Sequence, residues 1–405
     1  MRPHQCTLSA AHVYAHARRL MVAELELRDY KQAVPATVLA SVLLLAACWQ
    51  TSLSAACQLV NTSPSHESVR KALHACLPRR PRALLERLLA LLRHTLPDHL
   101  DRTPRVFVLD LHQRPFYGSK KRKGTSQRQA KKGTKTSFTY ATLAILSPAG
   151  RFTVALLPVP SHMRLTTIVE RLFAQAKQAG VPVAYLLADK EFYAAEVIDW
   201  LQRHHVPFIV PAKRRGKQGG NQHLFRASTE VGWDGYTWTA PLRRHDFATG
   251  KKHKRGTLTV QVSMCVTRHQ KRPERLVYAC WGLNSKQWSA AQVREAYRRR
   301  FGIEVSYRQL GQCLAKTSSG NERVRLLLVG MALFLCNLWS WLHSEVFATG
   351  PVSERCCLLH RARLRVLLAG LVAVLTDTFG GYRTEWMTQR PLPSILTIDQ
   401  DHCKD

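Results

Sequence analysis

The order of apolar segments between residues 103 and 212 constrains the fold of this chain more than any other feature. Three strand-like segments come first, RVFVLDLH, SFTYATLAIL and RFTVALLPV, the last two separated by a Pro-Ala-Gly turn. The segments TTIVERLFAQAKQ, VPVAYLLAD, AAEVIDWLQRH and VPFIVPA then alternate between helical and strand patterns. The sequence therefore predicts an α/β fold in which three antiparallel strands precede an alternation of helices and strands.

Three acidic residues occupy positions in this pattern where their side chains can meet. Asp110 ends the run VFVLD, Asp189 ends VAYLLAD, and Glu304 lies within EAYRRRFGIEVSYRQL, which has the pattern of an amphipathic helix. The succession of elements is similar to that of a ribonuclease H-like fold, a mixed sheet flanked by helices in which the first and fourth strands are neighbours. We therefore expect Asp110 and Asp189 to lie side by side, with Glu304 next to them.

The charge of the chain indicates a polyanionic partner. Its 405 residues include 60 Lys and Arg against 27 Asp and Glu, a formal net charge of +33. Nucleic acid is the commonest partner of such a protein, and a membrane surface is the weaker alternative. Because acids are scarce here, three of them at converging positions suggest a site for Mg²⁺ or Mn²⁺, which prefer hard oxygen ligands. The other interpretation of each acid is a turn, cap or solvated residue.

The rest of the chain divides around this core. Helical periodicity without strand signals predicts an all-helical N-terminal domain at 1–102. The first part of the core at 103–212 precedes segments such as YTWTA and TLTVQVSMCV, which predict a β-rich insertion at 213–285. Helical patterns then complete the core at 286–345 and continue as a C-terminal helical segment and tail at 346–405.

The N-terminal domain contains a possible helix-turn-helix at 52–75. Two short helical patterns flank a polar turn there, where Ser63 is expected to cap the second helix and Pro64 to occupy its first position. The alternative is a plain helical hairpin with solvated charges. As a helix-turn-helix, the second helix would offer its basic side chains to DNA: His66, Arg70 and Lys71.

One apolar run has the composition of a membrane span. Residues 326–342, LLLVGMALFLCNLWSWL, are short for a span and contain Asn337, so we expect a buried core helix and no membrane partner. No apolar signal core follows the basic start, and the 11 cysteines show neither a CxxC pair nor zinc-site spacing. We expect a cytoplasmic, nucleoid-associated protein with reduced thiols.

The helix that carries Glu304 concentrates further functional residues on one face. Tyr297, Arg300 and Arg308 stand seven before, four before and four after Glu304, and such spacings share a helix face. The arginines would hold phosphates next to a scissile bond, and Tyr297 would stack on the nucleic acid or donate a hydrogen bond to its backbone. The alternative is a salt-bridged surface helix.

The string YRRRFGIE resembles the Tyr, Arg and Glu of the YREK signature in DDE-class insertion-sequence transposases, the insertion sequence 4-like superfamily. The resemblance runs from about Thr103 to His343. It implies that Asp110, Asp189 and Glu304 form a triad that binds two Mg²⁺ or Mn²⁺ ions, and that Tyr297 and Arg300 are the signature Tyr and Arg.

The position of the signature Lys departs from the family pattern. It falls on Gly311, so either Arg308 or Lys316 substitutes or that phosphate contact is absent. Arg308 is favoured because it shares the face of Glu304. The string LDLHQRPFYGSK also resembles a subgroup of these transposases, in which His112 would reach a phosphate or a metal-bound water. A structural histidine is the alternative.

Basic residues flank both expected aspartates. The segment 118–137 contains eight Lys or Arg and no acid, which predicts a flexible loop that binds phosphate beside the crevice. A second basic cluster opens the insertion, and the two would contact duplex on both sides of the site. The candidate DNA contacts in these clusters are Lys120, Lys121, Arg122, Lys123, Lys131, Lys132, Lys213, Arg214 and Arg215.

Taken with the resemblance, these features predict a DNA transposase. It would bind the terminal repeats of its element, cut to expose 3′-hydroxyl ends and join them to target DNA. A homodimer is implied, since two element ends must be handled together. The alternatives are a metal-dependent nuclease on the same fold and a DNA-binding protein that has lost its chemistry.

Overall fold

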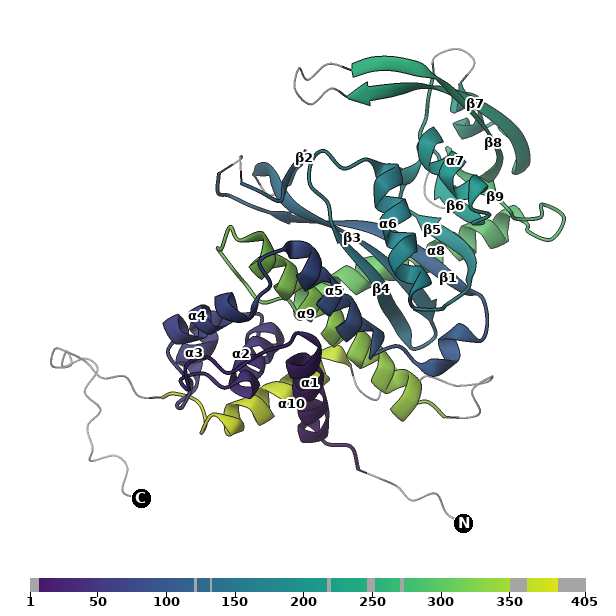
Figure 1. The fold of residues 1–405 in the computed structure, drawn as a ribbon. Helices are drawn as coiled ribbons and strands as arrows, with labels where there is room; N and C mark the ends of the chain where they lie inside the picture. Colours follow the sequence, from purple (N-terminus) through teal and green to yellow (C-terminus); the bar gives the residue numbers. More distant parts are fainter. Residues whose placement is uncertain are drawn as a thin grey trace, which may run out of the picture.

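A computed structural model describes residues 7–119, 122–131, 133–216, 220–245, 252–269, 273–349 and 363–384. Within these ranges a single mixed sheet forms the centre of the molecule, in the order β2-β3-β1-β5-β6-β9-β8-β7, with β4 paired to β3 (Figure 1). The strands are β1 Arg105–Pro115, β2 Thr125–Lys131, β3 Thr134–Ser147, β4 Gly150–Pro158, β5 Val183–Ala188, β6 Phe208–Pro211, β7 Gly232–His245, β8 Lys252–Arg268 and β9 Arg275–Trp281.

The centre of the sheet is built as the sequence predicts. Strand β1 is antiparallel to β3 and parallel to β5, and Leu109 pairs with Ala188. The residues that follow this pair are Asp110 and Asp189, so parallel pairing brings both to the same level of the sheet. Strands β3 and β4 join through a turn in which Gly150 has a φ of +133°, and a Cβ there would meet the Oγ of Ser340 at 2.7 Å.

The segment predicted to be a β-rich insertion does consist largely of strands, whereas the basic segment at 118–137 differs from its predicted structure. The insertion is a continuation of the central sheet, because β9 is antiparallel to β6 and then pairs with β8, which forms a long hairpin with β7 (Figure 1). The basic segment expected to be a flexible loop contains β2, which pairs with the first part of β3. In the basic segment, the hairpin with β3 makes a strand of residues that have a weak local pattern, and in the insertion, pairing of β9 with the distant β6 joins it to the sheet.

Helices cover both faces of the sheet. Helices α6 (Leu165–Lys177) and α7 (Ala195–Arg203) contact one another, α6 against β3 and β4 and α7 against β8. On the other side lie α5 (Pro81–Arg93), α8 (Ala290–Gln312) and α9 (Glu322–Trp341). Successive side chains of a strand point to opposite faces of the sheet, so both helical layers pack against apolar residues. Leu186 belongs to the main core, whereas Leu187 packs in a separate cluster with Val293 of α8.

Helix α9 is the apolar run predicted to be a core helix. With the π-helical turn at Leu342–Val346 it is long and apolar enough to cross a membrane, but 89% of its most apolar window is buried inside the protein. Asn337 lies where α9 meets the outer edge of β4. Its Oδ1 accepts a hydrogen bond from the Thr153 amide at 2.8 Å and its Nδ2 donates to the Thr153 carbonyl at 3.0 Å. The one amide in the run therefore satisfies backbone groups of an edge strand.

The remaining helices form a cluster below the sheet in Figure 1. Helix α10 (Leu364–Thr378) returns to pack on α1 (Ala10–Glu24) and α2 (Ala36–Cys48), so N-terminal and C-terminal segments share one core. One buried apolar cluster extends from these helices to the sheet. The predicted domain boundaries remain a prediction, and the tail beyond residue 384 lies outside the described residues.

The possible helix-turn-helix consists of α3 (Leu53–Leu59) and α4 (His66–Cys76). The two helices contact each other, but the connection is longer than the three or four residues usual for this motif. The predicted cap is wrong by two positions: the Ser65 side chain accepts the Ser68 amide at 3.2 Å, and Pro64 precedes the cap. A residue in the N-cap position uses its own hydroxyl on the second or third amide of the helix, which Ser63 is too far away to reach.

Candidate active site

Asp110 and Asp189 are held by the backbone that follows each of them. Asp110 lies within β1, which continues to Pro115 and does not end at the acid as the sequence suggested. Its Oδ1 accepts the Leu111 amide at 2.7 Å. Asp189 follows β5 directly, and its Oδ1 accepts the Lys190 amide at 2.6 Å at the start of a 3₁₀ turn. Both carboxylates are thus oriented by short hydrogen bonds.

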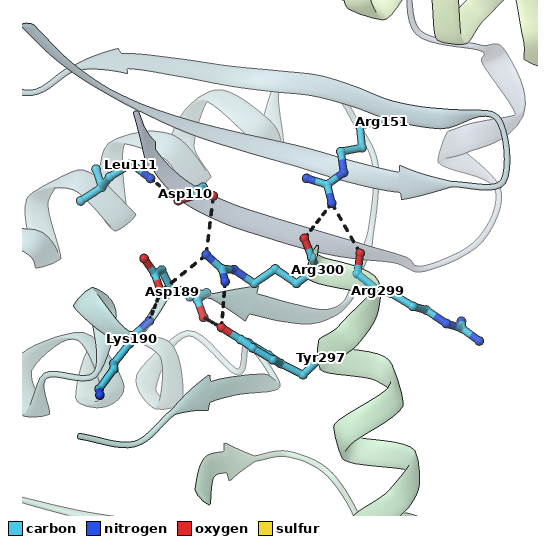
Figure 2. A network of polar contacts seen from close by, with 9 residues as sticks. Asp110, Leu111, Arg151, Asp189, Lys190, Tyr297, Arg299 and Arg300 are labelled. Atoms are coloured by element: carbon cyan, nitrogen blue, oxygen red, sulfur yellow. Dashed lines mark hydrogen bonds and ion pairs between the residues drawn. The ribbon is translucent and has the colours of Figure 1, made fainter. Parts of the chain in front are cut away.

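The guanidinium of Arg300 lies between the two carboxylates (Figure 2). Its Nη2 is 3.6 Å from Oδ2 of Asp110 and 3.5 Å from Oδ1 of Asp189. The side chains of Arg300 and Asp110 are each 10% exposed, and that of Asp189 is 38% exposed. One buried cation therefore lies at the point where both strands deliver their carboxylates.

Tyr297 supports this arginine from one turn earlier on α8. Its hydroxyl accepts a hydrogen bond from Nη1 of Arg300 at 2.9 Å and donates to the Ala188 carbonyl at 3.4 Å. Burial raises the pKa of Tyr297, so its hydroxyl stays protonated and able to donate. Burial alone would lower the pKa of Arg300, but Tyr297, Asp110 and Asp189 outweigh it and the pKa is raised.

Arg151 fixes the position of the helix that carries Arg300. This residue lies near the start of β4, and its Nη2 donates to the carbonyls of Arg300 at 3.0 Å and Arg299 at 3.5 Å (Figure 2). The bonds tie the outer strand of the sheet to the middle of α8. Sequence reasoning missed Arg151, because an arginine after a Gly turn carries no signal of a partner almost 150 positions away.

The third predicted acid lies on the expected helix. Glu304 is one turn beyond Arg300 on α8, but the side chains of residues 301–308, including Arg308, lie outside the described residues. Among the side chains that are described, no three His, Cys, Asp or Glu gather to hold a metal ion. Asp110 and Asp189 nevertheless fit a hard divalent cation, because their oxygens already converge on a cationic nitrogen.

A large basic cavity opens beside Asp189. It has a volume of about 1150 Å³ and is lined by Lys213, Arg294 and Arg298 as well as by the site itself. Burial lowers the pKa of Lys213, which faces this cavity. Arg214 also lines it and is paired with Glu274 at 2.7 Å. The cavity joins the predicted Lys213 cluster to Asp189 and has the charge and size to accept a nucleic-acid strand.

Other predicted DNA contacts are engaged within the protein. Arg215 stacks on Trp238, with its guanidinium 4.0 Å from the ring centroid, and burial lowers its pKa. Arg122 donates through Nε to the Gly320 carbonyl at 2.7 Å, and Lys123 lies 3.5 Å from Glu322. These contacts attach the basic segment to the connection between α8 and α9.

The remaining candidates have different surroundings. Arg70 and Lys71 are more than half exposed on α4 and pair with Glu67 at 2.7 and 3.6 Å. His112 lies two positions beyond Asp110 on the same face of β1, opposite Tyr140. The remaining three lysines lie outside the described residues: Lys120, Lys121 and Lys132. Lys131 belongs to β2, but its side chain is not among those described.

Comparison with known proteins places this chain in a family. The family model described as "Transposase DDE domain" matches residues 101–337. The fold is similar to a piggyBac transposase solved by cryo-EM as a synaptic complex with hairpin DNA, with a TM-score of 0.52 at 10% sequence identity, over 94% of this chain and 82% of that one. No curated protein matches the sequence.

The structural likeness supports the fold class, a ribonuclease H-like mixed sheet flanked by helices. The family match adds the assignment, because it spans more than half of the chain and covers the strands of Asp110 and Asp189 and the helix of Arg300. This protein belongs to the DDE-domain transposases, the enzymes of DNA transposition.

Proposed function

We propose that this transposase performs cut-and-paste DNA transposition with Asp110, Asp189 and Glu304 as its catalytic, metal-binding residues. The observation that carries the proposal is the convergence of Asp110 and Asp189 on one buried cation. The chain has a net charge of +33, and most arginines of such a chain are expected at its surface. Arg300 is instead buried between two carboxylates. Such an arrangement is expected where carboxylates must be held close together for a metal site.

The residues of the site would have separate roles in phosphodiester cleavage and joining. Two bound Mg²⁺ or Mn²⁺ ions would activate the attacking water or 3′-hydroxyl and stabilise the leaving oxygen. Asp110, Asp189 and Glu304 supply the hard oxygen ligands. Arg300, held by Tyr297, is placed to bind phosphate oxygens of the strand being cut when it leaves the carboxylates. Tyr297 and Arg300 support membership of the YREK group, with Gly311 as its departure.

The DNA partner is proposed to be the terminal repeats of the element and then the target duplex. The cavity beside Asp189 and the basic residues around it supply the charge that DNA binding needs. The similar piggyBac transposase was captured in a synaptic complex with DNA, which supports a homodimer that holds two ends here. We place this enzyme in the cytoplasm, associated with the nucleoid.

The test is cleavage and joining of labelled DNA that carries the repeats flanking the gene. Asp110→Asn and Asp189→Asn should bind this DNA but neither cut nor join it in Mg²⁺ or Mn²⁺. The matched control is Asp234→Asn, at an exposed position of β7. A native chain that cuts without joining would indicate a nuclease. One that binds the repeats and cuts nothing in either metal would indicate a DNA-binding protein without chemistry.

A further inference from the structure

A second basic cavity lies beyond the active site along β1. It has a volume of about 590 Å³ and is bounded by the end of β1, by Gln50 after α2, and by the connection from α8 to α9. Its basic lining residues come from three different segments: Arg114, Lys316 and Arg325. No acidic residue is among the residues of the described chain that line it.

Arg114 is the unusual member of this cavity. Its Nε and Nη2 atoms are buried and have no hydrogen-bond partner among the described residues. Burial lowers the pKa of Arg114 to about 10, which still leaves the guanidinium charged at neutral pH. A buried charge without a counterion is costly, so folding alone gives no reason to keep an arginine here. The cost is offset when an anion enters the cavity and accepts the unused donors.

Arg325 and Lys316 differ from Arg114 in how they are held. Arg325 donates to the Thr317 carbonyl at 3.3 Å and to the Ser319 carbonyl, and it stacks on Phe116 and Phe138. Its charge is therefore fixed in place. Lys316 is exposed, and its backbone amide donates to the Thr51 carbonyl at 2.9 Å. The cavity is thus lined by a fixed charge, an unsatisfied charge and an exposed charge from three different segments.

Gly311 keeps this space open. It also lines the cavity, and a Cβ built on it would meet no atom of the described residues within 4 Å. A longer side chain here would extend into the cavity, where its end would lie near the basic groups. The absence of a side chain at this helical position leaves room for a group the size of a phosphate.

We propose that this cavity binds a phosphodiester of the DNA strand that enters or leaves the active site. The inference rests on the function proposed above. Asp110 and Arg114 are four residues apart on one face of β1, which separates them by about 13 Å. A strand with its scissile phosphate at Asp110 would place a phosphate a few nucleotides away beside Arg114. The site would fix the direction in which the strand crosses the sheet.

The salt dependence of DNA binding tests this assignment. Arg114→Met keeps much of the side-chain volume and removes the charge, and Arg82→Met, at a position 89% exposed on α5, is the matched control. With a labelled duplex, the Arg114 variant should bind about tenfold more weakly. Its slope of log affinity against log salt should be smaller by about 0.9, the change for one lost phosphate contact. The control should match the native chain in both.

Thermal unfolding separates this role from a structural one. Removal of an uncompensated buried charge should leave Tm unchanged or raise it, while DNA binding weakens. Gly311→Lys in the Arg114→Met background should restore affinity, since the added ammonium enters the same cavity. A lower Tm with unchanged affinity and salt slope would overturn the proposal.

Two further outcomes are distinguishable. If inorganic pyrophosphate raises the Tm of the native chain but not of Arg114→Met, while DNA affinity is equal in both, the occupant is a free anion and the proposal fails. If the native chain binds no DNA at all, the proposed function fails with it. If the native chain and Arg114→Met bind and cut DNA equally well, the proposed function stands and only the phosphate site at Arg114 is overturned.

Discussion

Arg300 of helix α8 lies 3.6 Å from Asp110 of β1 through one guanidinium nitrogen, and the same nitrogen lies 3.5 Å from Asp189. A cation of the protein thus occupies the place where the two carboxylates meet. It lowers the repulsion between two acids that the sheet holds as neighbours. The stability of the site should therefore depend on which cation, the Arg300 guanidinium or a divalent metal ion, lies between the carboxylates. Unfolding measurements can test this dependence.

Arg300→Met should destabilise the protein most when no divalent metal is present. Without the guanidinium the two carboxylates repel each other in a largely buried site, and we expect a loss of about 2 kcal/mol in the free energy of unfolding. Mg²⁺ or Mn²⁺ should therefore stabilise Arg300→Met more than it stabilises the native chain. Thermal unfolding with and without metal measures both effects. An equal metal response in the two proteins would contradict the arrangement.

Arg151→Met should slow chemistry without abolishing DNA binding. Its bonds to the Arg299 and Arg300 carbonyls hold the middle of α8 against β4, so its loss should misplace Arg300 and Glu304 by a fraction of an ångström. We expect about a tenfold lower kcat for strand cleavage with little change in KM. Arg151→Lys should recover part of the rate. A change confined to KM would show that Arg151 acts on DNA directly.

Asn337→Ala should cost about 2 kcal/mol of unfolding free energy. The substitution leaves the Thr153 amide and carbonyl unpaired on an outer strand that α9 covers. Gln58→Ala, at an exposed position of α3, is the control and should change stability little. Chemical denaturation measures both variants. A loss no greater than that of the control would mean that water replaces the amide.

Acid should destabilise the helical cluster through its histidines. Burial, then Arg19 and His94, lower the pKa of His16 from its usual 6.5, and burial, then Arg323 and Arg70, lower that of His74. As pH falls below 6.5, these histidines therefore bind protons in the unfolded chain before they do so in the folded protein. The free energy of unfolding that they contribute is present above pH 6.5 and is lost as pH falls through their lowered folded pKa values. His16→Gln should flatten the fall in Tm between pH 7 and 5. An unchanged dependence of Tm on pH would mean that His16 does not contribute to the loss of stability in acid.

The order of the core elements and the placement of Asp110 beside Asp189 were predictable from the sequence. Both follow from local periodicity and from one topological rule, the adjacency of the first and fourth predicted strands, which are β1 and β5 in the structure. The buried helix of residues 326–342 was predictable for the same reason, since a single Asn in a short apolar run indicates a core position.

Other features depend on contacts that sequence spacing does not encode. The basic stretch of β2 has the composition of a loop but becomes a strand because β3 extends far enough to pair with it. Arg300 was expected to face DNA phosphates, and in the structure it faces two acids from separate strands. The role of Arg114 was not predictable either, because an arginine is unusual only when the burial of its nitrogens, and their lack of a hydrogen-bond partner among the described residues, are known.

The most direct test of the account is the joining of labelled repeat-end DNA to a target duplex in Mg²⁺, with the native chain compared with Glu304→Gln. Glu304 belongs to the proposed triad by its place on α8, one turn beyond Arg300. The account predicts that both proteins bind the repeats and that only the native chain yields cut and joined products. Equal joining by the two proteins would contradict the triad.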